Sequence, residues 1–232
     1  MQTQLTLDIQ LKESFTFDNY LTGDNPLVVS MLQDCVAANG ESQLYIWGAA
    51  FTGKSHLLQA ACHLAAQQKQ AVSYLPLKQW LQYPVDILQG LETMDVVCVD
   101  DVQQVAQSPA WQEAIFDLIN RLREAGKRLI FASNLPPNEL PLQLEDLRSR
   151  LNWSPVVPLI PLNDEQKCLA LQARAKSRGF DLPAAVAAYI LNNYSRELGR
   201  LLATLETLDQ ASLRHQRRLT IPFVKTVFDT QN

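Results

Sequence analysis

Short apolar runs recur along the first two thirds of the chain, separated by longer stretches of mixed polarity. They predict strands at residues 44–47, 71–75, 96–99 and 129–132. Residues 96–99 are apolar at every position, as expected for a strand that is covered on both faces. A fifth strand is predicted at residues 155–159, and the prolines that bracket it place it at an edge of the sheet.

The stretches between these runs have the spacing of amphipathic helices. Pro26 opens a predicted helix that Asn39-Gly40 closes, and further helices are predicted at residues 54–68 and 111–125. Strands that alternate with helices favour a parallel sheet with helices on both faces. The predicted fold class is therefore α/β.

The pattern changes after about residue 161, where no further strand is predicted. Helices are predicted at residues 163–178, 183–193 and 197–216, and from residue 221 onward. We therefore expect a tail at residues 1–14, an α/β nucleotide-binding domain at residues 15–161 and a small all-α lid domain at residues 162–232.

Composition excludes several classes of protein. The apolar fraction of 47% and the charged fraction of 19% are those of an ordinary globular chain, and no apolar run reaches the roughly 20 residues of a membrane span. The four cysteines are far apart, which is typical of free thiols in a reducing cytosol, and no secretion signal is present. A net charge of −4 argues against a protein whose main task is to grip duplex DNA. We expect a cytoplasmic protein.

A phosphate-binding motif lies between the first strand and the helix after it, with the sequence Gly48-Ala-Ala-Phe-Thr-Gly-Lys-Ser55. Glycines let several backbone N–H groups converge on a phosphate, as in a Walker A loop. Lys54 is expected to reach the β- and γ-phosphates, and the Ser55 hydroxyl to bind Mg²⁺. The predicted phosphate-binding residues are Gly48, Ala49, Ala50, Phe51, Thr52, Gly53, Lys54, Ser55 and His56.

Polar side chains follow the third and fourth predicted strands. Asp100 and Asp101 end the apolar strand, where Asp100 is expected to hold Mg²⁺ and Asp101 to polarise the attacking water. Asn134 follows the strand at residues 129–132 and can orient that water. From spacing alone, Asn134 could equally be a turn residue before Pro136. Arg150 and Arg196 could likewise be ordinary surface arginines.

Several segments together resemble the bacterial replication initiator DnaA, an AAA+ protein. They are Phe15-Thr-Phe-Asp-Asn-Tyr20, Gly53-Lys-Ser-His-Leu-Leu58, Asp100-Asp-Val-Gln103, Ser149-Arg-Leu-Asn-Trp153 and Arg196-Glu-Leu198, in that order. The resemblance covers roughly residues 15–200. We expect no room before Asn232 for the helix-turn-helix domain of an initiator.

The resemblance implies roles for individual residues. Phe17, Tyr20 and Leu21 would border the adenine, and Asn134 would be the first sensor. Arg196 would be the second sensor, reaching phosphate from the lid. Arg150 would be an arginine finger that acts in trans, in the site of a neighbouring subunit. The bound nucleotide is expected to be ADP, or ATP, with Mg²⁺.

The tail is similar to the short peptide by which proteins dock on the replication sliding clamp, with Gln4, Leu5 and Leu7 as the contacts. Asp8-Ile9 follows where that peptide usually carries an aromatic or bulky apolar group. The resemblance thus implies a negative regulator of replication initiation whose partners are DnaA and the sliding clamp. The protein would contact DNA mainly through the clamp. The resemblance is also compatible with a homo-oligomer.

Asp101 replaces the glutamate that is common in AAA+ proteins, which favours weak hydrolysis or none in the chain's own site. Two alternatives stay open. A DNA-binding replication factor, such as a helicase loader or a truncated initiator, would share the core motifs. A P-loop kinase for a small metabolite would leave Arg150, Arg196 and the lid without a use.

Overall fold

The computed structural model describes residues 11–12, 15–215 and 217–229. The chain divides into two compact units, residues 1–161 and 162–232. Among the described residues, every helix is too short or too polar to span a membrane.

The first unit is built on a five-stranded parallel sheet in the order β2-β3-β4-β1-β5. Its strands are β1 Gln43–Trp47, β2 Val72–Pro76, β3 Val96–Asp100, β4 Arg128–Ser133 and β5 Val156–Pro158. All five predicted strands are present, and β5 lies at an edge as the bracketing prolines indicated.

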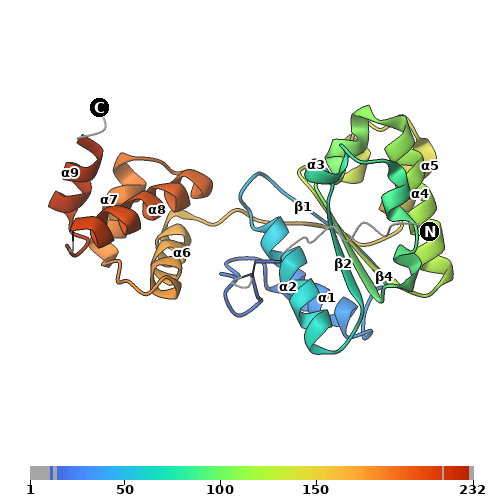
Figure 1. The fold of residues 1–232 in the computed structure, drawn as a ribbon, viewed down its shortest axis with the longest axis horizontal. Helices are drawn as coiled ribbons and strands as arrows, with labels where there is room; N and C mark the ends of the chain where they lie inside the picture. Colours follow the sequence, from blue (N-terminus) through green and yellow to red (C-terminus); the bar gives the residue numbers. More distant parts are fainter. Residues whose placement is uncertain (1–10, 13–14, 216, 230–232) are drawn as a thin grey trace, which may run out of the picture. The chain divides into compact units, whose positions relative to one another are not determined.

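Helices cover both faces of this sheet (Figure 1). α1 Pro26–Val36 and α2 Lys54–Gln67 pack on one face, and α3 Leu77–Trp80, α4 Pro109–Glu124 and α5 Glu145–Asn152 on the other. Short 3₁₀ turns lie at η1 Val85–Leu88, η2 Leu91–Thr93, η3 Val102–Gln107 and η4 Pro137–Glu139. The predicted α/β class is confirmed.

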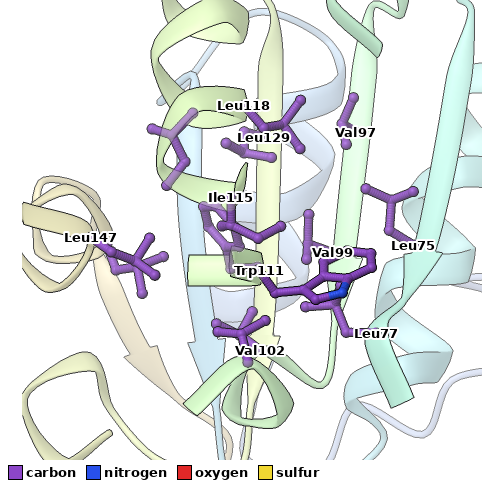
Figure 2. Packing of buried hydrophobic residues seen from close by; sticks show 14 of the residues in the cluster. Leu75, Leu77, Val97, Val99, Val102, Trp111, Ile115, Leu118, Leu129 and Leu147 are labelled. Carbon is purple, nitrogen blue, oxygen red and sulfur yellow. The ribbon is translucent and has the colours of Figure 1, made fainter. Parts of the chain in front are cut away.

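All five residues of β3 are buried, because the strand lies between two hydrophobic cores, one on each face of the sheet. Val96 and Cys98 face α1 and α2, whereas Val97 and Val99 face α4. Figure 2 shows the second of these cores. There, strand side chains from Leu75, Val97, Val99 and Leu129 meet Trp111, Ile115 and Leu118 of α4 and Leu147 of α5.

The second unit is all-helical in its described residues. Its helices are α6 Asp164–Ser177, α7 Ala184–Asn193, α8 Leu198–His215 and α9 Ile221–Asp229. A capping box begins α6: Asn163 accepts from the N–H of Gln166, whose side chain accepts from the N–H of Asn163. The helices surround one core that includes Leu171, Ile190, Leu201 and Leu205.

Candidate nucleotide-binding site

The strand order makes β1 and β4 neighbouring strands at a topological switch point of the sheet. The chain leaves β1 toward α2 on one face of the sheet, and leaves β4 toward α5 on the opposite face. Ligands of parallel sheets bind where neighbouring strands diverge in this way. The N–H of Gly48 donates to the carbonyl of Ser133 over 3.2 Å, so the phosphate-binding loop starts beside the end of β4.

The loop of residues 48–55 is held by its own polar groups. The Lys54 ammonium donates to the carbonyls of Gly48 and Ala49, over 2.7 and 2.8 Å, and the Thr52 hydroxyl donates to the carbonyl of Ala49 over 3.0 Å. Lys54 is buried, and this burial lowers the pKa of its ammonium while Asp100 and Asp101 oppose the shift. The loop is therefore compact and holds a cation at its centre.

Two glycines of the loop meet other parts of the unit closely. A Cβ at Gly53 would lie 2.6 Å from a ring carbon of Tyr20, and the backbone of Gly53 has a φ of +91°. A Cβ at Gly48 would lie 3.0 Å from the carbonyl of Leu159. At Gly53 a side chain would displace the Tyr20 ring and strain the backbone, whereas at Gly48 it would require Leu159 to give way by a few tenths of an ångström.

The segment before α1 lies against the start of α2. His56 shares a hydrogen bond of 2.8 Å with the carbonyl of Thr16, and its ring stacks on Phe15 at 4.6 Å. The Tyr20 hydroxyl donates to the carbonyl of Thr52. Phe17 packs against the core beneath α1 and α2, and Leu21 is half-buried. The structure thus brings Tyr20 and His56, both predicted site residues, to the phosphate-binding loop.

Asp100 ends β3 with its carboxylate buried and fully engaged. One oxygen accepts from the N–H of Asp101 over 2.9 Å, and the other from the Tyr74 hydroxyl over 2.7 Å. Burial raises the pKa of Asp100, and its hydrogen bonds with Ser55 and Tyr74 oppose that shift. Burial and the carboxylate of Asp100 raise the pKa of Tyr74, which therefore stays protonated and donates.

Asp101 is joined to the end of β4 through one amide side chain. Gln103 donates from its amide nitrogen to Asp101 over 2.9 Å. The Gln103 oxygen accepts from the Ser133 hydroxyl over 3.0 Å and from the N–H of Asn134 over 3.2 Å. Asp101 has a φ of +59°, a conformation that aspartate tolerates better than most residues. Asn134 is exposed, and its N–H contacts the same Gln103 side chain that binds Asp101, a position that is compatible with a water-orienting residue.

The donor set suits Mg²⁺ bound together with a polyphosphate. The Ser55 hydroxyl and the Asp100 carboxylate interact directly, so two hard oxygen ligands lie side by side at the loop. Among the described residues there is no cluster of three or more His, Cys, Asp or Glu that could hold a metal by itself. Mg²⁺ typically takes only one or two protein oxygens in such sites and completes its shell with phosphate and water.

Phe51 occupies a strained position at the tip of the loop. Its φ is +62°, and its side chain is 53% exposed. A non-glycine residue in this region costs of order 1–3 kcal/mol, and an exposed ring recovers little of that by packing.

We therefore expect Phe51→Gly to stabilise the nucleotide-free chain by about 1 kcal/mol, which raises Tm by roughly 2–4 °C in a chain of this size. Thermal unfolding followed by circular dichroism measures the change. Ala50→Gly is the matched control, because Ala50 has no positive φ; it should lower Tm slightly, since glycine raises the entropy of the unfolded chain. A Phe51→Gly variant that melts below the parent would show that the position is unstrained.

Arg150 lies on α5, next to Trp153. Its guanidinium carbon is 3.9 Å from the centre of the Trp153 ring and 5.6 Å from that of Phe116. Gln43 donates to the backbone carbonyl of Arg150 over 2.9 Å, which fixes the base of the side chain. No hydrogen bond or ion pair joins Arg150 to the phosphate-binding loop within the described part of the chain.

The remaining predicted residues belong to the second unit or to the part of the chain that the structure does not describe. Arg196 belongs to the second unit, where it is 3.8 Å from Asp164 and its side chain is 73% exposed. Gln4, Leu5 and Leu7 lie outside the described residues, so their role in clamp binding stays a prediction.

Two side chains of the site had no predicted role, namely Tyr74 and Gln103. Gln103 follows Asp101 by two residues, so the motif at residues 100–103 already marked its position. Tyr74 is 26 residues from Asp100 in the chain, and only the pairing of β2 with β3 brings them together.

Fold and site define a class of protein: a parallel α/β unit with a Walker A loop, acids at the end of β3 and an all-helical second unit, as in AAA+ ATPases. Residues 11–157 match the family described as the bacterial DnaA ATPase domain, and the chain belongs to that family. Residues 164–228 match the family described as Hda, lid domain. The chain is a DnaA-related AAA+ protein with an Hda-like lid.

Solved structures agree with this fold. Domain III of the replication initiation protein DnaA from Thermotoga maritima is 22% identical with a TM-score of 0.85, and the match covers 95% of this chain and 98% of that one. A DnaA initiator bound to AMPPCP and single-stranded DNA is 23% identical with a TM-score of 0.75, over 89% and 69% of the two chains. The RuvB branch-migration motor of Thermotoga maritima is 12% identical with a TM-score of 0.71, over 93% and 71%.

Proposed function

We propose that this protein is a negative regulator of replication initiation that acts on ATP bound to the initiator DnaA. It docks on the DNA-loaded sliding clamp through Gln4, Leu5 and Leu7, and it offers Arg150 in trans to the initiator's nucleotide. The observation that carries the proposal is the environment of the Arg150 guanidinium. Its guanidinium lies over an exposed indole and has no carboxylate partner among the described residues, so it is available to a phosphate outside the chain.

The protein's own site binds ADP, or ATP, with Mg²⁺. Backbone N–H groups of residues 48–55 cradle the phosphates, and Lys54 exchanges its loop carbonyls for phosphate oxygens. Ser55 and Asp100 would hold Mg²⁺, which supplies charge neutralisation between the phosphates. The DnaA relative bound to AMPPCP supports an adenine nucleotide. Arg196 would contact phosphate from the lid.

Hydrolysis in this site is expected to be slow. Asp101 is the residue that would polarise water, yet its carboxylate already accepts from Gln103. Asn134 would orient the same water. The nucleotide then acts mainly as a structural ligand that fixes the shape of the first unit, whereas the catalytic contribution is made by Arg150 in the partner's site.

The testing experiment measures ATP hydrolysis by DnaA with this protein, ADP and DNA-loaded clamp present. The triple variant Gln4→Ala, Leu5→Ala, Leu7→Ala should stimulate about 10²-fold less at low concentration, because clamp docking raises the effective concentration of the protein near its target. Stimulation should return at high concentration, since Arg150 is intact.

Gln10→Ala, outside the clamp motif, is the control and should behave as the parent. Equal stimulation with and without the clamp, or by parent and triple variant at every concentration, would refute clamp docking. No stimulation under any condition would refute the proposed function as a whole.

A second candidate is a DNA-binding replication factor. The similarity to a DnaA initiator bound to single-stranded DNA favours it, and the net charge of −4 opposes it. Salt-dependent affinity for single-stranded DNA, measured by fluorescence anisotropy without clamp, would support this candidate.

A further inference from the structure

Trp153 is an exposed aromatic residue that carries two arginines from different helices. Its side chain is 56% exposed, and the guanidinium carbons of Arg150 and Arg123 lie 3.9 and 4.3 Å from the centre of its ring. Arg123 comes from the last turn of α4, and Arg150 and Trp153 come from the end of α5. We call these three residues the indole platform.

Neither arginine of the platform is neutralised within the part of the chain that the structure describes. Among the described residues, no carboxylate lies within ion-pair distance of Arg123 or Arg150, although other arginines are paired, such as Arg121 with Glu92 and Arg148 with Glu145. The Nε of Arg150 is buried and has no hydrogen-bond partner in the described structure. Two like charges on one ring repel each other, and an anion bound beside them relieves that repulsion.

The segment that bears the platform is held rigidly. Gln43 donates to the carbonyl of Arg150 from the start of β1, and the Ser154 hydroxyl donates to the carbonyl of Leu151. Leu147 and Leu151 anchor α5 in the core, with no exposed surface. The backbone below Arg150 is therefore fixed, whereas the direction of its long side chain depends on what its guanidinium touches.

A flat guanidinium on an aromatic face keeps its exposed N–H groups at its rim, where they can donate to phosphate oxygens. A carboxylate partner would hold Arg150 equally well but would occupy those same donors. An indole is thus a support that orients the cation and leaves its hydrogen-bonding capacity unused.

We propose that Trp153 is the positioning residue for Arg150, and that Arg123 is a second cation of the platform that faces the same polyphosphate. The proposal rests on the proposed function, because it assumes that Arg150 acts on a nucleotide outside this chain. It deepens that function by assigning two further residues to the surface that meets the partner's phosphates.

The test uses the full chain in the clamp-dependent DnaA assay, with four variants: Trp153→Phe, Trp153→Leu, Trp153→Gln and Arg123→Gln. Trp153→Leu and Trp153→Gln should lower the maximal stimulated rate about three- to tenfold, the range that a partly exposed cation–π contact supports. The concentration for half-maximal stimulation should stay unchanged, because the docking contacts are intact. Trp153→Phe keeps an aromatic face and should retain most of the rate.

Arg123→Gln should lower the maximal rate less than Arg150→Ala does. Its matched control is Arg121→Gln, because Arg121 is paired with Glu92.

A second measurement reports on the contact between Arg150 and the Trp153 ring. Protons of Arg150 above the indole should show upfield NMR shifts that are lost in Trp153→Leu and Trp153→Gln and retained in Trp153→Phe.

The outcomes separate the two proposals. If Arg150→Ala abolishes stimulation but both Trp153→Leu and Trp153→Gln stimulate like the parent, Trp153 does not position the finger, while the proposed function stands. A reduced rate with unchanged Arg150 shifts would likewise overturn the positioning role. If Arg150→Ala stimulates like the parent, the finger assignment fails, and the role of the platform fails with it.

Discussion

Replacement of Arg150 by alanine is expected to remove nearly all stimulation of ATP hydrolysis by DnaA. A guanidinium supplied in trans stabilises charge on the transferring phosphoryl group and is worth about 10³- to 10⁵-fold in rate. The loss should appear in the maximal rate, because the clamp tail and the surrounding surface are unchanged. Single-turnover hydrolysis of labelled ATP on DnaA, with saturating protein, ADP and loaded clamp, measures it.

The matched controls are Arg150→Lys and Arg200→Ala. Lysine keeps the charge but cannot donate in the planar, two-pronged manner of a guanidinium, so it should recover only a small part of the rate. Arg200 is an exposed arginine of the second unit, and its loss should have no effect. Arg150→Ala should also keep its own nucleotide and its thermal stability. If it stimulates at the parent's maximal rate, the finger lies elsewhere.

Replacement of Lys54 by methionine is expected to weaken nucleotide binding by about 10²-fold or more. Lys54 is a buried cation at the centre of the loop, where loss of one partner from a buried charged contact costs about 2–5 kcal/mol. Isothermal titration with ADP and Mg²⁺, and the rise in Tm that ADP produces, both measure the loss.

Lys78→Met is the control for this experiment, because Lys78 is an exposed lysine away from the loop. It should bind ADP like the parent. Unchanged ADP affinity in Lys54→Met would mean that the nucleotide does not sit in the loop of residues 48–55. If nucleotide also fixes the competent shape, Lys54→Met should lower stimulation of DnaA even though Arg150 is present.

The strands could be predicted from sequence because each is a short apolar run, and the long helices because their apolar spacing is regular. Two helices were not predicted. α3 has four residues and α5 has eight, which is too short for a clear periodicity, and α5 forms because Leu147 and Leu151 pack into the core. The strand order could not be predicted either, because β1 pairs with β4 and β5, which come much later in the chain.

The sequence by itself determined the chemistry of the phosphate-binding loop and of the acids after β3, because each motif is local and its place at a strand end follows from the apolar pattern. The tertiary structure alone decided which residues support that chemistry. Tyr74 reaches Asp100 across 26 residues of chain, and Ser133 reaches Gln103 across 30. Trp153 meets Arg123 because α4 and α5 pack on the same face of the sheet. Such contacts depend on strand order and helix packing, which many distant side chains fix together and no local pattern encodes.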